Sequence, residues 1–107
     1  MRTHEAPIGA VLSLITGKMI PVKGSKGSGF AEMQELAEFL VGHPILTHEF
    51  GSKALAADLA ERCRARIPAH LAAETGESVH DGDTAWALRN KWSVVYGDTI
   101  TIEVGEP

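Results

Sequence analysis

Residues 11–18, VLSLITGK, form a short apolar segment that stops at a glycine and passes into a basic, glycine-rich stretch. Counted from Ile8, the apolar side chains here recur at i+3, i+4 and i+7, which is the spacing of one helix face. Pro7 is tolerated in a first helical turn, and Gly17 favours the left-handed conformation that ends helices. The segment therefore predicts a helix that ends at Gly17, with a strand as the alternative because three of its residues are β-branched.

Three further helices follow from the same kind of pattern. An apolar stripe predicts a helix over 30–41, which ends at Gly42. Ser52 is suited to cap the next helix, which Pro68 interrupts or restarts, with a turn or two over 69–74. Asp83 or Thr84 is suited to cap the last helix, which runs to Gly97.

Residues 99–104, TITIEV, alternate strictly between polar and apolar side chains, which predicts a strand with one buried face. A single strand cannot satisfy its own backbone groups, so we expect it to pair with 18–22, with part of 43–50, or with another chain. The chain is predicted to be one small α+β domain over 1–107, mostly helical with about four helices. A flexible glycine-rich loop is expected at 23–29 and an exposed loop at 75–83.

Composition restricts the class of protein. One cysteine excludes an intrachain disulfide and suggests a reducing compartment, and no apolar run approaches the roughly 18 residues that span a bilayer. We therefore expect a soluble, cytoplasmic protein that does not bind membranes. Residues 1–26 carry a net charge of +3 and residues 27–107 carry −7, which gives −4 for the whole chain. Such an acidic balance disfavours direct nucleic-acid binding and is compatible with a basic protein partner.

Several motifs occur in a recognisable order along the chain. They are the segment from Pro7 to Lys18, the pentapeptide LTHEF at 46–50, and the pair Tyr96-Gly97 that follows Trp92 and precedes the alternating strand. In this order the chain resembles a family of small bacteriophage and prophage proteins of unknown function, whose patterns are Leu-Ser-x-Thr-Thr-Gly-Arg/Lys, Thr-His-Gln-Leu and Tyr-Gly. The structural motif positions are Thr16, Gly17, Thr47, His48, Tyr96 and Gly97. The resemblance implies a phage or prophage origin and the cytoplasm of a bacterial host, without implying an activity.

The basic loop is the first candidate site. Lys18, Lys23, Lys26 and Ser28 precede a helix N-terminus, where free N–H groups favour an anion such as a phosphate or nucleotide. The order of a phosphate-binding Walker loop is missing, so a solvated loop is the alternative.

Histidine and cysteine offer little chemistry. His48 could serve as a base or a metal ligand, and the alternative is a structural role in its loop. The run from His80 to Asp83 matches no known metal spacing, and Cys63 falls on an apolar helix seam. We therefore expect no metal, no cofactor and no catalytic residues.

Protein contacts are the remaining possibility. Glu32, Glu35 and Glu38 share the polar side of one predicted helix, and Trp86 and Trp92 are spaced so that both cannot face the core. We expect a non-enzymatic interaction protein that binds a host protein or ribonucleoprotein, with inhibition of a defence system (anti-CRISPR-like) as its most specific form. A homodimer is one alternative arrangement, and a small-ligand (nucleotide or phosphate) binding or sequestering protein is the alternative function.

Overall fold

The computed structural model describes residues 2–23 and 29–105. Its elements, in chain order, are the following: β1 (Arg2–Pro7), α1 (Ile8–Thr16), α2 (Phe30–Val41), the 3-10 helix η1 (Thr47–Gly51), α3 (Lys53–Arg64), α4 (Ala69–Ala72), α5 (Gly82–Tyr96) and β2 (Thr99–Val104). The predicted α+β class with a C-terminal strand is confirmed. The described part of the chain has five α-helices, because the turns after Pro68 form the separate helix α4.

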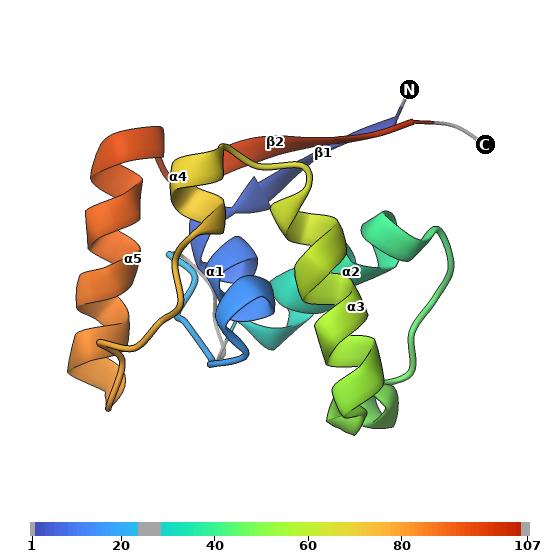
Figure 1. The fold of residues 1–107 in the computed structure, drawn as a ribbon, viewed down its shortest axis with the longest axis horizontal. Helices are drawn as coiled ribbons and strands as arrows, with labels where there is room; N and C mark the ends of the chain where they lie inside the picture. Colours follow the sequence, from blue (N-terminus) through green and yellow to red (C-terminus); the bar gives the residue numbers. More distant parts are fainter. Residues whose placement is uncertain (1, 24–28, 106–107) are drawn as a thin grey trace.

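Helix α1 occupies the centre of the fold. It packs against α2, α3 and α5, and the two strands lie above it (Figure 1). Every residue from Ile8 to Ile15 is buried, including Gly9 and Ser13, so α1 has no solvent-exposed face until Thr16. The apolar segment that ends at Gly17 is therefore the central helix of the core, and the alternative prediction of a strand for this segment is wrong.

The sheet joins residues near the two ends of the described chain. β1 and β2 are antiparallel, with Arg2 opposite Val104 and Ala6 opposite Ile100. The prediction that β2 pairs with 18–22, with 43–50 or with another chain is wrong. The sequence RTHEAP of β1 is mostly polar and lacks the β-branched apolar residues that are typical of strands. Such a sequence is tolerated here because only Ala6 of this strand is fully buried and most of its other side chains face solvent.

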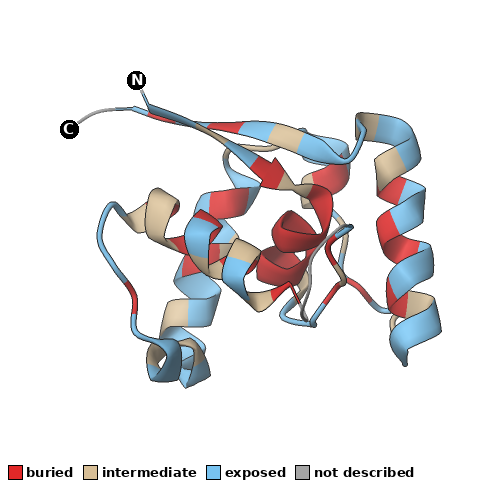
Figure 2. Ribbon diagram, turned by 180° about the vertical axis from the view of Figure 1, so that it is seen from behind, coloured by how far each residue is buried: buried red, intermediate tan, exposed pale blue. Residues whose placement is uncertain are grey.

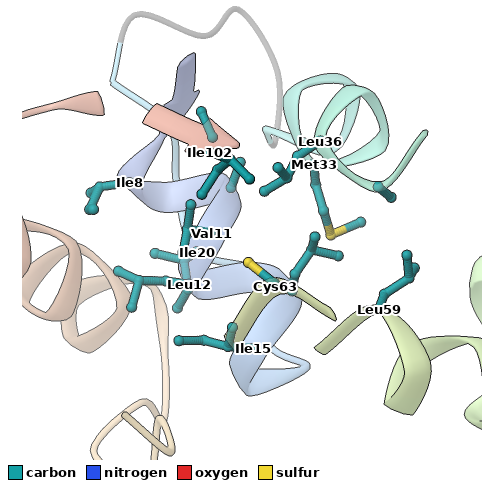
Figure 3. Packing of buried hydrophobic residues seen from close by; sticks show 14 of the residues in the cluster. Ile8, Val11, Leu12, Ile15, Ile20, Met33, Leu36, Leu59, Cys63 and Ile102 are labelled. Carbon is teal, nitrogen blue, oxygen red and sulfur yellow. The ribbon is translucent and has the colours of Figure 1, made fainter. Parts of the chain in front are cut away.

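The core surrounds α1 on three sides. Figure 3 shows Val11, Leu12 and Ile15 of α1 among side chains from its neighbours. α2, α3 and β2 contribute further side chains to this cluster, and the figure labels five of them: Met33, Leu36, Leu59, Cys63 and Ile102. Fully burying a side chain of this size stabilises a fold by about 1.5–3 kcal/mol, so the contacts between α1 and its neighbours are a main source of stability.

Local signals explain where the helices begin and end. Gly17 and Gly42 adopt the left-handed conformation after α1 and α2, as predicted. Ser52 caps α3, and its side chain accepts a hydrogen bond from the Leu55 amide. The expected cap of the last helix was wrong: Asp81, not Asp83 or Thr84, is the N-cap of α5, and its carboxylate accepts from the Thr84 amide at 2.9 Å.

The connections differ from the predicted loops in two ways. Residues 24–28 of the predicted loop 23–29 lie outside the described residues. The loop predicted at 75–83 ends at Asp81, and Gly76 within it is buried against Thr16. Among the described residues, no helix combines the length and the apolar character needed to cross a membrane.

Helix α5 lies at one edge of the molecule. Figure 2 shows its buried bands facing the rest of the fold and its exposed bands facing solvent. The buried side consists of Ala85, Leu88, Arg89 and Trp92. This helix therefore packs on one side only.

Candidate functional site

The motif residues at the end of α1 hold the fold together. The Ser13 hydroxyl donates to the Gly9 carbonyl at 2.8 Å and accepts from the Ile20 amide at 2.9 Å, which holds the returning chain against the helix. Thr16 donates to the Leu12 carbonyl, and its oxygen accepts from the Lys18 amide. These contacts give Thr16 and Gly17 a structural role at the end of α1.

Lys18 is part of the same arrangement. Its Nζ donates to the carbonyl oxygens of Gly76 at 2.7 Å and of Val79 at 3.1 Å, which ties the α4–α5 connection to the end of α1. Arg64 from α3 donates to the Ile15 carbonyl at the same helix end. The ammonium group of Lys18 is thus held by the protein's own carbonyl groups.

The other residues proposed for ligand binding do not converge with Lys18 in the described structure. Lys23 forms an exposed ion pair with Asp98, with 3.2 Å between Nζ and Oδ2. Lys26 and Ser28 lie outside the described residues. Of the two described lysines of the predicted anion site, Lys18 makes a structural contact with backbone carbonyl groups and Lys23 forms a surface ion pair.

The glutamates of α2 do not form a uniform exposed face. Glu35 is exposed, whereas Glu32 and Glu38 are partly buried. Glu38 Oε2 accepts from the Ile45 amide at 2.8 Å and so positions the chain after α2. Glu38 is therefore a structural residue, and of the three glutamates only Glu35 is exposed, as the sequence pattern suggested.

The histidine motifs show no catalytic or metal-binding arrangement. Thr47 and His48 are both exposed in η1. His80 and Asp81 lie in the turn before α5, where the Thr84 hydroxyl accepts from both backbone amides. Within residues 2–23 and 29–105, no group of three or more histidine, cysteine or acidic side chains is placed to hold a metal ion.

Cys63 is a core residue. It is fully buried against α1, and burial raises the pKa of its thiol from 9.0 to about 12, although Arg64 and Arg66 lower the pKa in part. The thiolate is the nucleophilic form of cysteine, so burial and the raised pKa both disfavour reaction of this thiol in the folded protein.

Trp92 is the buried one of the two tryptophans. Its Nε1 donates to Glu74 Oε1 at 2.9 Å, and its ring stacks on Tyr96. Burial raises the pKa of Glu74, but hydrogen bonds from the Gly76 amide and the Trp92 indole, together with Lys91, outweigh it and hold the pKa below its usual value. Trp92 and Tyr96 therefore anchor α5 to the fold, and Trp92 presents no surface to a partner.

Trp86 is the exposed tryptophan. It is 45% exposed, and the guanidinium group of Arg89 lies 4.6 Å from the centre of its ring. Arg89 is buried, and its Nε has no hydrogen-bond acceptor in the described structure. Stacking on a buried group restricts the rotamers of Trp86, which lowers the entropy lost when a partner covers it.

Trp86 belongs to a continuous solvent-facing strip, which we term the α5 outer face. Its residues share helical spacing and are all exposed: Asp83, Trp86, Ala87, Asn90 and Val94. Val94 is 87% exposed, the highest value among the large exposed apolar side chains of the described chain. The sequence prediction missed Val94 and Arg89, although their spacing from Trp86 along the helix was a visible signal.

A small apolar pocket lies between α1, α2 and α3. Its volume is about 220 Å³, and its walls include Leu14, Met19, Met33 and Phe50. Ligand sites span roughly 300–1,000 Å³ and place a few free polar groups among apolar ones. Ser13 and Lys18 also line this pocket, but both are engaged in the contacts described above. The pocket therefore lacks the polar groups that would orient a ligand.

The fold and these contacts define a small α+β domain in which the motif at the end of α1 makes structural contacts and one face of α5 is left uncovered by the described residues. The chain belongs to a family described as a domain of unknown function (DUF7736), whose match covers residues 6–72, more than half of the chain. The matched range includes α1 to α4 and excludes the α5 outer face. No curated protein and no solved structure matches the chain.

Proposed function

We propose that this chain is a non-enzymatic interaction protein that binds another protein through the α5 outer face. The observation that carries the proposal is Trp86, an aromatic side chain held half-exposed by a stacked arginine. Tryptophan and arginine are the residue types most enriched among those that dominate binding energy at protein interfaces. Val94, two turns further along the helix, extends the apolar surface.

The charges around α5 define the kind of partner. Exposed acidic side chains lie before the helix at Glu77 and Asp81 and in its first turn at Asp83, and the whole chain has a net charge of −4. A partner that offers an apolar recess for Trp86 with lysine or arginine at its rim would match this surface in shape and sign. A nucleic acid would be repelled by it.

In its most specific form, the proposal is that the protein comes from a phage or prophage and inhibits a bacterial defence complex in the host cytoplasm. This form rests on the sequence resemblance, the small size and the acidic balance. The general form rests on the α5 outer face alone. Either a host protein or a ribonucleoprotein with a basic protein surface fits the general form.

Affinity capture with matched variants tests the proposal. Trp86→Ala and Val94→Asp alter the α5 outer face, and Leu46→Ala alters an exposed apolar side chain away from it, in the segment before η1. We expect a bacterial protein that is captured by the wild type and by Leu46→Ala and lost with the two α5 variants. The partner, once purified, should bind the wild type at least tenfold more tightly than Trp86→Ala. A partner that all variants capture equally would refute the α5 surface as the binding site.

Self-association through the α5 outer face must be distinguished from binding to a host protein. Analytical ultracentrifugation of the wild type over a range of concentrations measures it directly. A dimer abolished by Val94→Asp would assign the α5 outer face to a second copy of this chain and contradict the host-protein proposal. A monomer at all concentrations leaves the surface free for another protein.

A further inference from the structure

Three arginines from distant parts of the sequence meet at one open pocket. Arg2 comes from β1, and Arg62 and Arg66 come from the end of α3 and the residues just after it. The pocket has a volume of about 460 Å³, and its other walls are Leu40, Val41, Gly42, Val104 and Gly105. No acidic side chain lines this pocket in the part of the chain that the structure describes.

The fold explains the convergence. Arg2 lies opposite Val104 at the open end of the sheet. Because side chains alternate between the two faces of a strand, Arg2 lies on the same face of β1 as His4 and Ala6, which is the face toward the core. Its guanidinium group therefore extends beyond the core toward the end of α2, where it lies 5.2 Å from the centre of the Phe39 ring. The pairing of β1 with β2 is what brings Arg2 to the two helix ends.

Each guanidinium group retains free donors. Arg62 Nε donates to Asp58 Oδ2 at 2.8 Å, and Arg66 Nη1 donates to the Arg62 carbonyl at 2.8 Å. A guanidinium group carries five N–H donors, so these contacts hold the two side chains in place and leave most of their donors unused. Arg2 is held by its contact with the face of a ring, which uses no N–H donor.

Among the described side chains that line the pocket or pair with its arginines, positive charge exceeds negative charge. The three arginines contribute +3 and Asp58 contributes −1. The C-terminal ends of α2 and α3 each add a partial charge of about −0.5. The remainder is about +1, in a protein whose overall charge is −4.

We infer that this pocket binds a phosphate-type oxyanion, either as the free ion or as the phosphate group of a larger molecule. Arginine forks match the oxygen edges of phosphate and form charge-assisted pairs that are stronger than neutral hydrogen bonds. Three arginines that line one pocket suit a group with three or four acceptor oxygens better than a carboxylate with two. This site is separate from the α5 outer face and shares no residue with the lysine loop.

Solution NMR with inorganic phosphate at low ionic strength tests the inference. We expect titration to shift the backbone amide signals of Gly42, Val104 and Gly105 and the Nε–H signals of Arg2 and Arg66, with a single saturating curve. Arg2→Gln and Arg66→Gln should each weaken binding about tenfold, which corresponds to about 1.4 kcal/mol. The control is Lys53→Gln, which removes one positive charge at the opposite end of α3 and should leave the affinity within twofold.

Other outcomes separate the alternatives. Arg2→Lys and Arg66→Lys retain the charge, so a folded variant of this kind that still loses affinity would show that the arginine forks, and not charge alone, hold the ion. Shifts spread evenly over all lysines, or affinities unchanged in both glutamine variants, would overturn the site. Tighter binding of acetate than of phosphate would overturn the phosphate assignment. A free phosphate and a phosphomonoester are distinguished by repeating the titration with glycerol 3-phosphate, which binds more tightly if the site serves a larger molecule.

Discussion

Replacing Gly9 by alanine should destabilise this protein, although the usual effect of that change within a helix has the opposite sign. Gly9 lies in α1 with an ordinary negative φ, so helix propensity alone predicts a gain of about 0.5–1 kcal/mol. A Cβ atom at this position would lie 2.1 Å from the carbonyl oxygen of Pro21 and 2.9 Å from its carbonyl carbon. Propensity and packing therefore make opposite predictions.

The size of the effect follows from these contacts. Real Cβ atoms essentially never come closer than 3.0 Å, so the Pro21 carbonyl would have to move by at least 0.9 Å. The residues on either side of this carbonyl resist such a shift, because Ile20 and Val22 are buried and the Ile20 amide is hydrogen-bonded to the buried Ser13 hydroxyl. Overpacking of a core costs about 1–3 kcal/mol. An overpacking cost near the upper end of that range, less the propensity gain of about 0.5–1 kcal/mol, gives an expected net loss of about 2 kcal/mol and a fall in Tm of about 10 °C.

Urea unfolding followed by tryptophan fluorescence measures the change, because Trp92 is buried and becomes exposed on unfolding. Gly82→Ala is the matched control. Gly82 is also a helical glycine, but nothing lies within 4 Å of the position of its Cβ, so this variant should be as stable as the wild type or slightly more stable. A Gly9→Ala variant with an unfolding midpoint at or above that of the wild type would refute the packing argument.

Three further predictions concern the buried polar groups and the thiol. Ser13→Ala leaves the buried amide of Ile20 without its acceptor and should cost about 1–3 kcal/mol in the same urea assay; an unchanged midpoint would show that this hydrogen bond contributes nothing. Cys63 should react with a thiol reagent such as DTNB at pH 8 only on the timescale of unfolding, because the thiol is buried and its pKa is raised to about 12. In urea it should react at once. Rapid reaction of the folded protein would contradict its burial. The lowered pKa of Glu74 means that its contacts stabilise the fold above the ordinary pKa of 4.5 and are lost as the pH falls through the lower folded value. Glu74→Gln should therefore reduce stability at pH 7 and flatten the decline of unfolding free energy below pH 4.5, and a decline equal to that of the wild type would contradict this assignment.

The helices were predictable because their signals are local. Apolar spacing is visible along each helix, and the terminal glycines and the Ser52 cap lie directly at the helix ends. Helices α1, α2 and α3 therefore begin and end close to the expected residues. The N-cap of α5 was misplaced because several polar residues in succession can cap a helix. Only the side-chain contact of Asp81 with the Thr84 amide distinguishes among them.

The sheet and the sites were not predictable in the same way. β1 is polar along most of its length, and its only strong signal is its pairing with a strand almost the whole chain away. The arginine pocket depends on that pairing, so no pattern near Arg2 could indicate it. Lys18 illustrates the opposite error, because a lysine beside a glycine-rich loop indicates an anion site in sequence but holds two backbone carbonyl groups in the fold.

The distance along the chain between the paired strands also affects how the protein is made. Residues 2–7 leave the ribosome well before their partner at 99–104, which emerges only after helices α1 to α5. Until then the first strand has no backbone partner, and Ile102 is not yet in place above the central helix. A nascent chain arrested before residue 99 should thus hold a helical core with one open side, where an unpaired strand and apolar side chains are available to chaperones or to other nascent chains.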